Sequence, residues 1–263
     1  MTTYSHEMRV ALMVVKEAGA FLKMHFGEEQ KVDQESPHDL KLEIDRLAQN
    51  LIVARLVEAF PEYAVLGEEA YVGGSDNECE WIVDPLDGSV NYYYGIPCFC
   101  VSIALRCEGV VVLGVIYDPM LDECWSVERG GFAYLNGRVI HCSSRERMAE
   151  AVVSMENESK AGEDHESSKL VKIATKVRKI RNNGSAALSL AYIATGRFDA
   201  YVKGVLSIWD LASGVLLIEA SGGQVELTSL RQAGGVDDSG SSDEQFSLIA
   251  WNGRIPLLKA LAE

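Results

Sequence analysis

Positively charged residues are scarce in this sequence relative to acidic ones. The 263 residues include 24 Lys and Arg against 39 Asp and Glu, which gives a formal net charge of −15. Nucleic acids and anionic membranes are bound by clustered Lys and Arg, so this balance argues against both as partners. A small anionic substrate stays compatible with it, because bound cations can reverse the local field of a site. Most of the carboxylates are expected to form a solvated surface.

Long hydrophobic runs are also missing. The longest run near the start, residues 10–15, stops at Lys16 and lacks the basic lead-in and the small-residue cleavage site of a signal peptide. We therefore expect no membrane-spanning segment and a cytoplasmic location.

Cysteine pairs with metal-binding spacing do not occur. None of the six cysteines forms a C-x-x-C pair, and no His-rich segment surrounds them. In a chain of this length they are predicted to be reduced, mostly buried thiols, and a zinc site is not expected. They are Cys79, Cys98, Cys100, Cys107, Cys124 and Cys142.

Hydrophobic periodicity in the first half predicts an α+β arrangement, which we assign to a subdomain of residues 1–145. Apolar residues recur at three- and four-residue steps in two segments, which predicts two helices joined by a polar connection at 27–38. Short apolar runs after them predict buried strands. The helices are expected at 8–22 and 47–57, and the strands at 64–66, 81–83, 99–105, 110–117 and 124–127, with a hairpin turn at 108–109.

The second half alternates more regularly and predicts an α/β subdomain over residues 146–263. Together the two subdomains predict a single unit, 1–263, layered as helices and sheets. A segment rich in Gly, Ser and Asp, 233–243, predicts a surface loop. The strands are expected at 151–155, 179–181, 200–202 and 246–250, and the helices at 167–177, 185–194, 209–220 and 255–261.

The segment 81–91, WIVDPLDGSVN, has the most informative chemistry. A strand leads into Asp84, and Pro85 removes a ladder hydrogen bond and turns the chain. Asp84 and Asp87, three residues apart on such a turn, can converge on a hard cation. Gly88 lets the backbone approach a ligand, and the amides after it suit a phosphate. The alternative, an Asp-Pro turn with a helix cap, explains one of the carboxylates but not both.

Other acidic residues stand where strands end and helices begin. Each has an ordinary alternative, which is a solvated turn for the glutamates and helix capping for the aspartates. Together they supply the oxygen ligands that a site for two or three Mg²⁺ ions requires. They are Asp39, Asp45, Glu68, Glu69 and Asp210.

Two long motifs resemble those of a known family. Residues 84–89, DPLDGS, are similar to its D-P-[IL]-D-G-[ST] motif, and residues 209–223, WDLASGVLLIEASGG, resemble its W-D-x-A-[AS]-G…E-A-G-G motif. The Gly-Glu-Glu at 67–69, the Asn-Gly-Ser-Ala-Ala at 183–187 and the Asp39/Asp45 pair stand in the family's order. This is the inositol monophosphatase family, in the wider group of lithium-sensitive, magnesium-dependent sugar-phosphate phosphatases that includes fructose bisphosphatase.

The resemblance extends from about residue 10 to residue 258 and implies a layered α-β-α-β-α sandwich that acts as one catalytic unit. It also implies two or three Mg²⁺ ions, with Li⁺ as an inhibitor. The first Mg²⁺ would be bound by Glu68, Asp84 and the carbonyl of Leu86. Asp84, Asp87 and Asp210 would bind the second, and a third, weaker ion would lie near Glu68.

The catalytic residues that the resemblance implies are Asp45, Ser89 and Glu68. Asp45 and the Ser89 hydroxyl would orient the attacking water and help to deprotonate it. The amides of Gly88 and Ser89 would hold the substrate phosphate, and the alcohol portion would lie against the segment 184–186. The complete substrate-binding set is Asp87, Gly88, Ser89, Gly184, Ser185, Ala186, Lys203 and Asp210.

Three positions depart from the family's pattern. Ser89 replaces the commoner threonine but keeps the hydroxyl, so activity should survive. Gln34 stands where many members have a lysine near the metals. Lys203, seven residues before Asp210, stands where inositol-selective members have a glutamate that accepts hydrogen bonds from ring hydroxyls. A lysine cannot accept them and would suit a second anionic group on the substrate, whereas the alternative is an exposed loop lysine.

These features predict a Mg²⁺-dependent phosphomonoesterase for a small phosphorylated metabolite, with inositol 1-phosphate as the default substrate. Histidinol phosphate, fructose 1,6-bisphosphate and 3′-phosphoadenosine 5′-phosphate are the other candidates. A hypothesis of another class is an inactive relative that binds a metabolite or a partner in a regulatory role. A homodimer is expected by resemblance. The aromatics Tyr92, Tyr93 and Tyr94 would line a pocket mouth or the subunit interface, with packing in the core or at its rim as an equal alternative.

Overall fold

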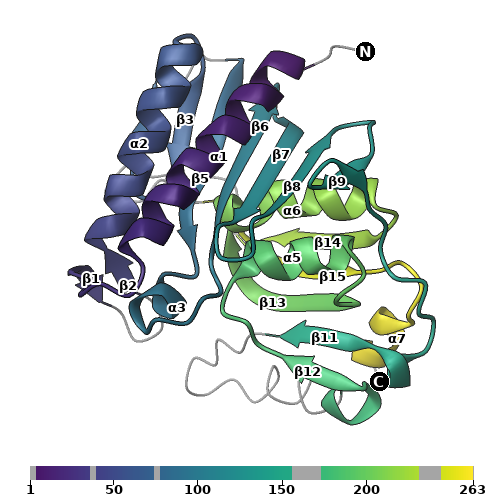
Figure 1. Ribbon diagram of the computed structural model, residues 1–263. Helices are drawn as coiled ribbons and strands as arrows, with labels where there is room; N and C mark the ends of the chain where they lie inside the picture. The colour runs from purple at the N-terminus through teal and green to yellow at the C-terminus, as the bar shows by residue number, and fades with distance from the viewer. Residues whose placement is uncertain (1–3, 36–39, 74–77, 156–172, 231–243, 263) are drawn as a thin grey trace.

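The computed structural model of the protein describes residues 4–35, 40–73, 78–155, 173–230 and 244–262 (Figure 1). Asp39, the loop expected at 233–243 and the first part of the helix expected at 167–177 lie outside these residues. Of the latter helix, residues 173–176 are described and are helical. Among the helices of the described ranges, none combines the length and the apolar composition needed to cross a membrane.

The first half of the chain builds a sheet of eight strands covered by two long helices. Leu12 and its periodic neighbours form the predicted first helix, which the structure extends in both directions. The elements are α1 (Ser5–His25), β1 (Val32–Glu35), β2 (Leu40–Leu42), α2 (Glu43–Ala59), β3 (Ala64–Gly67), β4 (Tyr71–Val72), β5 (Cys79–Asp87), α3 (Ser89–Tyr93), β6 (Cys100–Cys107), β7 (Val110–Asp118), β8 (Glu123–Glu128), β9 (Ala133–Leu135) and β10 (Arg138–Val139).

The strands of this sheet follow the order β10-β9-β8-β7-β6-β5-β3-β4. All neighbours are antiparallel except β3 and β5, which run parallel. The predicted hairpin joins β6 to β7, and Glu108 and Gly109 both have positive φ, of 50° and 76°, as a tight two-residue turn requires. The separate pair β1–β2 was not expected: β1 lies within the polar connection predicted at 27–38, and β2 follows it.

The second half forms a five-stranded sheet with the order β12-β11-β13-β15-β14. β12, β11 and β13 are parallel, and β15 and β14 continue the sheet antiparallel. The predicted strand at 200–202 continues to Ser207, and β14 was not expected. The elements are η1 (Met148–Glu150), β11 (Val152–Met155), β12 (Lys179–Arg181), α5 (Ala186–Ala194), β13 (Ala200–Ser207), α6 (Ile208–Ala220), β14 (Gln224–Ser229), β15 (Gln245–Trp251) and α7 (Leu257–Ala262).

Stacked layers of helix and sheet confirm the predicted α-β-α-β-α sandwich (Figure 1). α1 and α2 pack on the outer face of the eight-stranded sheet, and α5 and α6 lie between the two sheets. On the far face of the five-stranded sheet, Ile173 and α7 cover a smaller core around Val153 and Trp251. α5 and α6 have apolar residues on nearly every side because sheets bury them from both directions.

The expectation of reduced thiols is wrong for one pair. Cys79 and Cys107 form a disulfide at the position where they face each other across β5 and β6. Antiparallel pairing placed these residues together, although they are 28 positions apart in the sequence, so no local spacing could indicate the bond. The other four cysteines are free thiols.

Tyr92 does not lie with the other two tyrosines of its run. Its side chain is buried, and its hydroxyl donates a hydrogen bond to the carbonyl of Leu22 at 2.8 Å. Tyr93 and Tyr94 are exposed. Tyr92 therefore belongs to the core under α1, so of the alternatives left open for this run, core packing holds for Tyr92.

Candidate active site

Two acidic residues lie side by side because β3 and β5 are parallel neighbours. Gly67, the last residue of β3, pairs with Val83, and the chain then continues into Glu68 on one strand and Asp84 on the other. The amide of Glu68 donates a hydrogen bond to the Val83 carbonyl at 3.2 Å, which holds the two strand ends together. The predicted position of Glu68 at a strand end is confirmed.

Asp84 and Asp87 both lie on β5 and both are buried. The strand does not stop at Pro85 as expected, because pairing with β6 resumes at Asp87 after an irregular step in register. The amide of Leu86 donates to Oδ1 of Asp84 at 3.0 Å, and the Ser89 hydroxyl donates to the Leu86 carbonyl at 3.1 Å. At the irregular step, polar groups within the segment 84–89 therefore form hydrogen bonds with one another.

Asp87 is bound to the start of α5, from the other half of the chain. Its Oδ2 accepts hydrogen bonds from the Ser185 hydroxyl and from the amide of Ala187, both at 2.6 Å. Its Oδ1 accepts from the amide of Ala186 at 3.2 Å. Amides at a helix start have no partner within the helix and favour a negative charge, so this carboxylate joins the two halves of the molecule.

Glycine is required at two points beside Asp87. Gly88 has a φ of +106°, and a Cβ there would lie 3.0 Å from the carbonyl oxygen of Cys98. Gly184 has a φ of +68°, and its Cβ would lie 2.8 Å from Nδ2 of Asn91. The turn after Asp87 therefore packs closely against the backbone of neighbouring segments, which a side chain at position 88 would prevent.

Asp45 and Asp210 reach the site from the first turns of two different helices. Each is the third residue of its helix, and each accepts a hydrogen bond from the backbone amide just before the helix. The bond from the Leu42 amide to Asp45 measures 2.7 Å, and the bond from the Ser207 amide to Asp210 measures 2.8 Å. Each carboxylate thus caps its helix from the third helical position, whereas the ordinary alternative placed Asp210 at the N-cap and gave Asp45 only an interaction with the helix dipole, and this bond fixes where each carboxylate lies.

The carboxylates are close enough to perturb one another. Burial raises the pKa of Glu68 well above its usual range, and the nearby charge of Asp210 raises it further, while Lys41 opposes the shift. Burial also raises the pKa of Asp84 well above its usual range. The charges of Glu68, Asp87 and Asp210 raise this pKa further. We call Asp45, Glu68, Asp84, Asp87 and Asp210 the acidic cluster.

The acidic cluster has the donor chemistry of a Mg²⁺ site. Its oxygens are carboxylates in a self-repelling group, which cations would stabilise, and Mg²⁺ prefers such ligands. Among the described residues, no three His, Cys, Asp or Glu side chains already have the geometry of a metal site. Oxygens of Asp45, Asp87 and Asp210 instead bond to amides, so cations would have to draw on these oxygens or on their remaining lone pairs.

The residues expected to contact substrate differ in exposure. Gly184 is exposed, whereas Ser185 and Ala186 are buried and donate to Asp87. Lys203 lies on β13, opposite Leu248 of β15, and is partly exposed. The alternative of a loop lysine is therefore wrong for Lys203, which a strand holds just before an irregular step leading to Leu206.

Several residues of the site had no signal in the sequence. Nδ2 of Asn91 donates to the carbonyls of Cys98 and Asn183, both at 2.7 Å, and so ties the turn to the loop before α5. Lys41 pairs with Glu69 at 3.1 Å and lies opposite Gln34 in the β1–β2 pair. Lys41 thus brings a cation to the edge where Gln34 lacks one.

Cys100 is a further residue of the site that the sequence did not single out. Its Sγ lies 3.7 Å from Oδ2 of Asp87, across the strand pair. Burial raises the pKa of the Cys100 thiol well above its usual range, and the charges of Asp87 and Asp84 add to this. The thiol therefore stays protonated and donates to the carboxylate.

Comparison with known proteins identifies the family of the chain. A model of the inositol monophosphatase family matches residues 4–251. The inositol-1-monophosphatase of Mesorhizobium japonicum is 41% identical over 224 residues, covering 83% of this chain and 84% of that protein. The Nus factor SuhB of Xylella fastidiosa is 37% identical over 252 residues, covering 93% and 90%. The crystal structure of extragenic suppressor protein suhB from Bartonella henselae matches with a TM-score of 0.87 at 36% identity, covering 98% of this chain and 99% of that chain.

The layered fold and these similarities place the chain among the phosphoric monoester hydrolases. The match to the family extends over nearly the whole chain and includes both halves that meet at Asp87. The chain belongs to the inositol monophosphatase family.

Proposed function

We propose that the protein is a Mg²⁺-dependent phosphomonoesterase that releases phosphate from a small polyol or sugar phosphate, with inositol 1-phosphate as the first candidate. The observation that carries the proposal is the meeting of the acidic cluster with the glycine turn at Gly88. The name of the Mesorhizobium japonicum relative supports this substrate. Histidinol phosphate, fructose 1,6-bisphosphate and 3′-phosphoadenosine 5′-phosphate are the alternatives.

The metal-holding residues in this proposal are Glu68, Asp84, the carbonyl of Leu86, Asp87 and Asp210. When bound, Mg²⁺ would supply the positive charge that offsets the charge of the phosphate and of the leaving alkoxide. The protein contributes fixed positions for these oxygens, since each carboxylate lies within β5, directly after β3, or in the first turn of a helix. Holding them in place before the reaction lowers the reorganisation that the reaction requires.

The chain's own groups then position the reactants. The amides of Gly88 and Ser89 hold the phosphate, and the exposed Gly184 lies where the alcohol portion would pass. Asp45 and the Ser89 hydroxyl orient the attacking water and accept its proton in turn, which requires both to lie within hydrogen-bond reach of it. Ser185 and Ala186 act on substrate through Asp87, whose carboxylate they hold.

Lys203 bears on which substrate the proposed enzyme prefers. A strand lysine before Asp210 offers hydrogen-bond donors and a positive charge, so it favours a substrate with a second anionic group. The variant Lys203→Glu should move the ratio of kcat/KM for inositol 1-phosphate over fructose 1,6-bisphosphate upward by about tenfold, which corresponds to one lost ionic hydrogen bond. Lys203→Met, which removes the charge without adding an acceptor, is the control. An unchanged ratio in both variants would remove Lys203 from the substrate site.

A phosphate-release screen tests the function. The purified chain is assayed with inositol, histidinol, fructose and adenosine phosphates, with and without millimolar Mg²⁺ and with added Li⁺. We expect Mg²⁺-dependent release from at least one substrate and inhibition by Li⁺. Asp118→Asn serves as a matched control for variants of the acidic cluster, because Asp118 is also buried but accepts its hydrogen bonds from the amides of Met120 and Leu121.

A regulatory role without catalysis is the second candidate. The observation that favours it is the name of the Xylella fastidiosa relative, Nus factor SuhB, which is similar over most of this chain. Every expected metal ligand that the structure describes is an unaltered Asp or Glu side chain or a backbone carbonyl, which favours catalysis. If no substrate of the screen releases phosphate with Mg²⁺ present, the regulatory role replaces the enzymatic one.

A further inference from the structure

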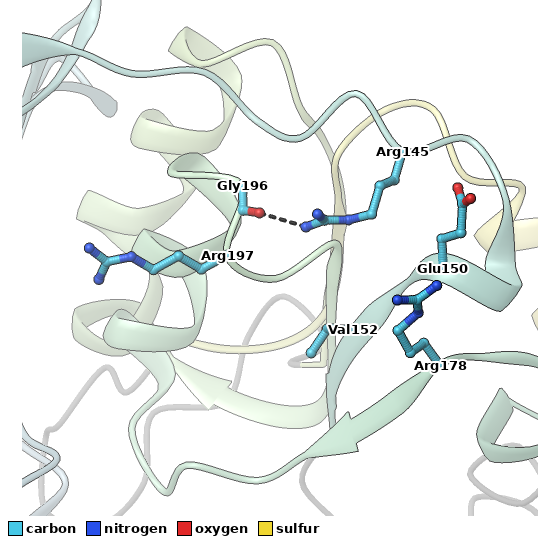
Figure 2. Close-up of a pocket in the computed structure, with 6 residues that line it drawn as sticks. All are labelled: Arg145, Glu150, Val152, Arg178, Gly196 and Arg197. Atoms are coloured by element: carbon cyan, nitrogen blue, oxygen red, sulfur yellow. Dashed lines mark hydrogen bonds between the residues drawn. The ribbon is translucent and has the colours of Figure 1, made fainter.

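A cavity of about 590 Å³ opens at one end of the strands of the five-stranded sheet, and Asp210 lies at their other end. β11, β12 and β13 are parallel, and the cavity lies where they begin, whereas Asp210 follows the end of β13. Its size falls in the range of small-molecule sites. The lining residues are Arg145, Glu150, Val152, Arg178, Gly196 and Arg197 (Figure 2).

Arg145 is held rigidly at the rim of this cavity. Its Nε lies 2.8 Å and 2.9 Å from the two carboxylate oxygens of Asp199, which is fully buried, and its Nη2 donates to the Gly196 carbonyl at 2.6 Å. Asp199 is fixed in turn by the amide of Val152 at 2.8 Å. These bonds leave Nη1 of Arg145 without a hydrogen-bond partner among the residues described here. A fixed guanidinium loses little entropy when it binds an anion.

Arg178 brings a second guanidinium to the cavity from the turn before β12. Its backbone amide bonds to the Ala151 carbonyl at 3.0 Å, while its side chain is exposed and forms no ion pair with any residue in the described ranges. Figure 2 shows its side chain beside that of Glu150. Arg197 differs, since its side chain extends away from Arg145 in Figure 2 and pairs with Glu123.

Glu150 marks the point where an anion is favoured. Its carboxylate pairs with Arg147, and the charges of Arg178 and Arg145 also act on it, so that the pKa of Glu150 is lowered. Because Glu150 lines the cavity beside Arg178, its carboxylate would compete with an external anion there. Arg145 and Arg178 both line this cavity, in a chain where Lys and Arg number 24 against 39 Asp and Glu.

We propose that this cavity binds a small phosphate-bearing ligand through Arg145 and Arg178, at a site separate from the acidic cluster. The guanidinium fork matches the oxygens of a phosphate, and the cavity has room for the rest of a small metabolite. The fold connects the two sites through α5, whose first residues bond to Asp87 and whose following turn supplies Gly196 and Arg197. The proposal does not depend on which substrate the enzyme hydrolyses.

Phosphate binding to the full chain tests this site. Titration calorimetry is performed with inorganic phosphate in the presence of EDTA, because the acidic cluster without cations repels the anion and does not contribute. Sodium chloride keeps the ionic strength constant. We expect saturable binding of one phosphate per chain in the wild type. Absence of saturable binding would overturn the proposal.

Three substitutions separate this site from general charge effects. Arg178→Gln should weaken phosphate binding about tenfold, the loss expected for one charge-assisted hydrogen bond. Glu150→Gln should tighten binding a few-fold, because it removes the competing carboxylate. Arg138→Gln, an equal change of charge at an exposed residue of β10, should leave the affinity unchanged. Equal losses in Arg178→Gln and Arg138→Gln, or no loss in Arg178→Gln, would overturn the proposal.

Discussion

The two ends of α5 (Ala186–Ala194) bind side chains of opposite charge, through amides at the start and through a carbonyl beyond the end. At its start, amides of Ala186 and Ala187 donate to the buried carboxylate of Asp87. Beyond its end, the carbonyl of Gly196 accepts from the guanidinium of Arg145. Both arrangements follow the helix dipole, which favours an anion at the start and a cation at the end.

The difference between the two ends lies in what balances each charge. Arg145 has its counter-charge inside the fold, in Asp199, so this ion pair is neutral as built. Asp87 has neutral donors around it and other carboxylates nearby, so the balancing charge must come from outside the chain. Beyond the end of the helix lies an ion pair whose guanidinium has further hydrogen-bond donors. At the start of the helix lies a site that needs cations.

Removing the charge of Asp87 should have the largest effect. Asp87→Asn keeps the shape of the side chain and an acceptor for Ala187, but it removes a carboxylate that the proposed function assigns to the metal. Phosphate release should fall at least a hundredfold, roughly the upper loss seen when even an outer-shell partner of a metal is removed. Initial rates with saturating Mg²⁺ measure this. Full activity in this variant would refute the assignment, and Asp118→Asn should retain activity.

Removing the ion pair beyond the end of α5 should lower the free energy of unfolding without changing the rate of phosphate release. Asp199 is fully buried and accepts from Arg145, Ser143 and the amide of Val152. Asp199→Asn leaves the guanidinium without its counter-charge and should cost about 3 kcal/mol of unfolding free energy. Urea denaturation measures the loss.

Glu17→Gln is the control for that ion pair. Glu17 pairs with Arg55 at 2.7 Å, but both side chains are exposed, by 36% and 45%. Solvent screening should keep the loss below about 1 kcal/mol. Equal losses in the two variants would mean that burial does not set the strength of the pair at the end of α5.

The sequence indicated the acidic end of α5 but not the basic end. Asp84, Asp87 and Gly88 are contiguous and share one turn, so their chemistry is visible within a few residues. Arg145, Arg178 and Asp199 come from three separate segments, and only the parallel pairing of β11 with β12 and β13 brings them together. The same limit applies to Cys79 and Cys107, which the β5–β6 register places opposite each other.

For the fold, periodicity predicted elements with strong internal patterns and missed those defined by their neighbours. The helices α1 and α6 have long apolar repeats and were expected, as was the β6–β7 hairpin. β1 has four exposed residues and no apolar alternation, whereas β14 has only two apolar residues, Val225 and Leu227, too short a pattern to mark a strand. β5 passed beyond Pro85 because its partner β6 resumed pairing at Asp87.

Charge reduction within the acidic cluster should stabilise the chain when metal is absent. Asp84→Asn keeps an acceptor for the Leu86 amide, removes one of the repelling carboxylates and should raise the stability of the EDTA-treated protein by about 1 kcal/mol, or roughly 2–4 °C in Tm. Added Mg²⁺ should raise the Tm of the wild type and of Asp118→Asn, but much less that of Asp84→Asn, since ligand binding stabilises only the form that binds. Equal Mg²⁺ shifts in all three proteins would contradict a metal-binding role for Asp84.

The smallest effect is expected from the hydroxyl that holds Asp87 in place. Ser185 caps α5 by accepting from the Leu188 amide at 3.2 Å, and it donates to Asp87 at 2.6 Å. Ser185→Ala should cost about 1 kcal/mol of stability through the lost cap. It should also raise the Mg²⁺ concentration for half-maximal activity a few-fold, because Asp87 loses a donor that orients it. Ser213→Ala removes an equally buried hydroxyl, which accepts from Ser102 on β6, and should change stability alone. If the two variants respond to Mg²⁺ alike, the start of α5 stabilises the fold without orienting the metal ligand. Its two ends would then differ only in the sign of the charge that each one binds.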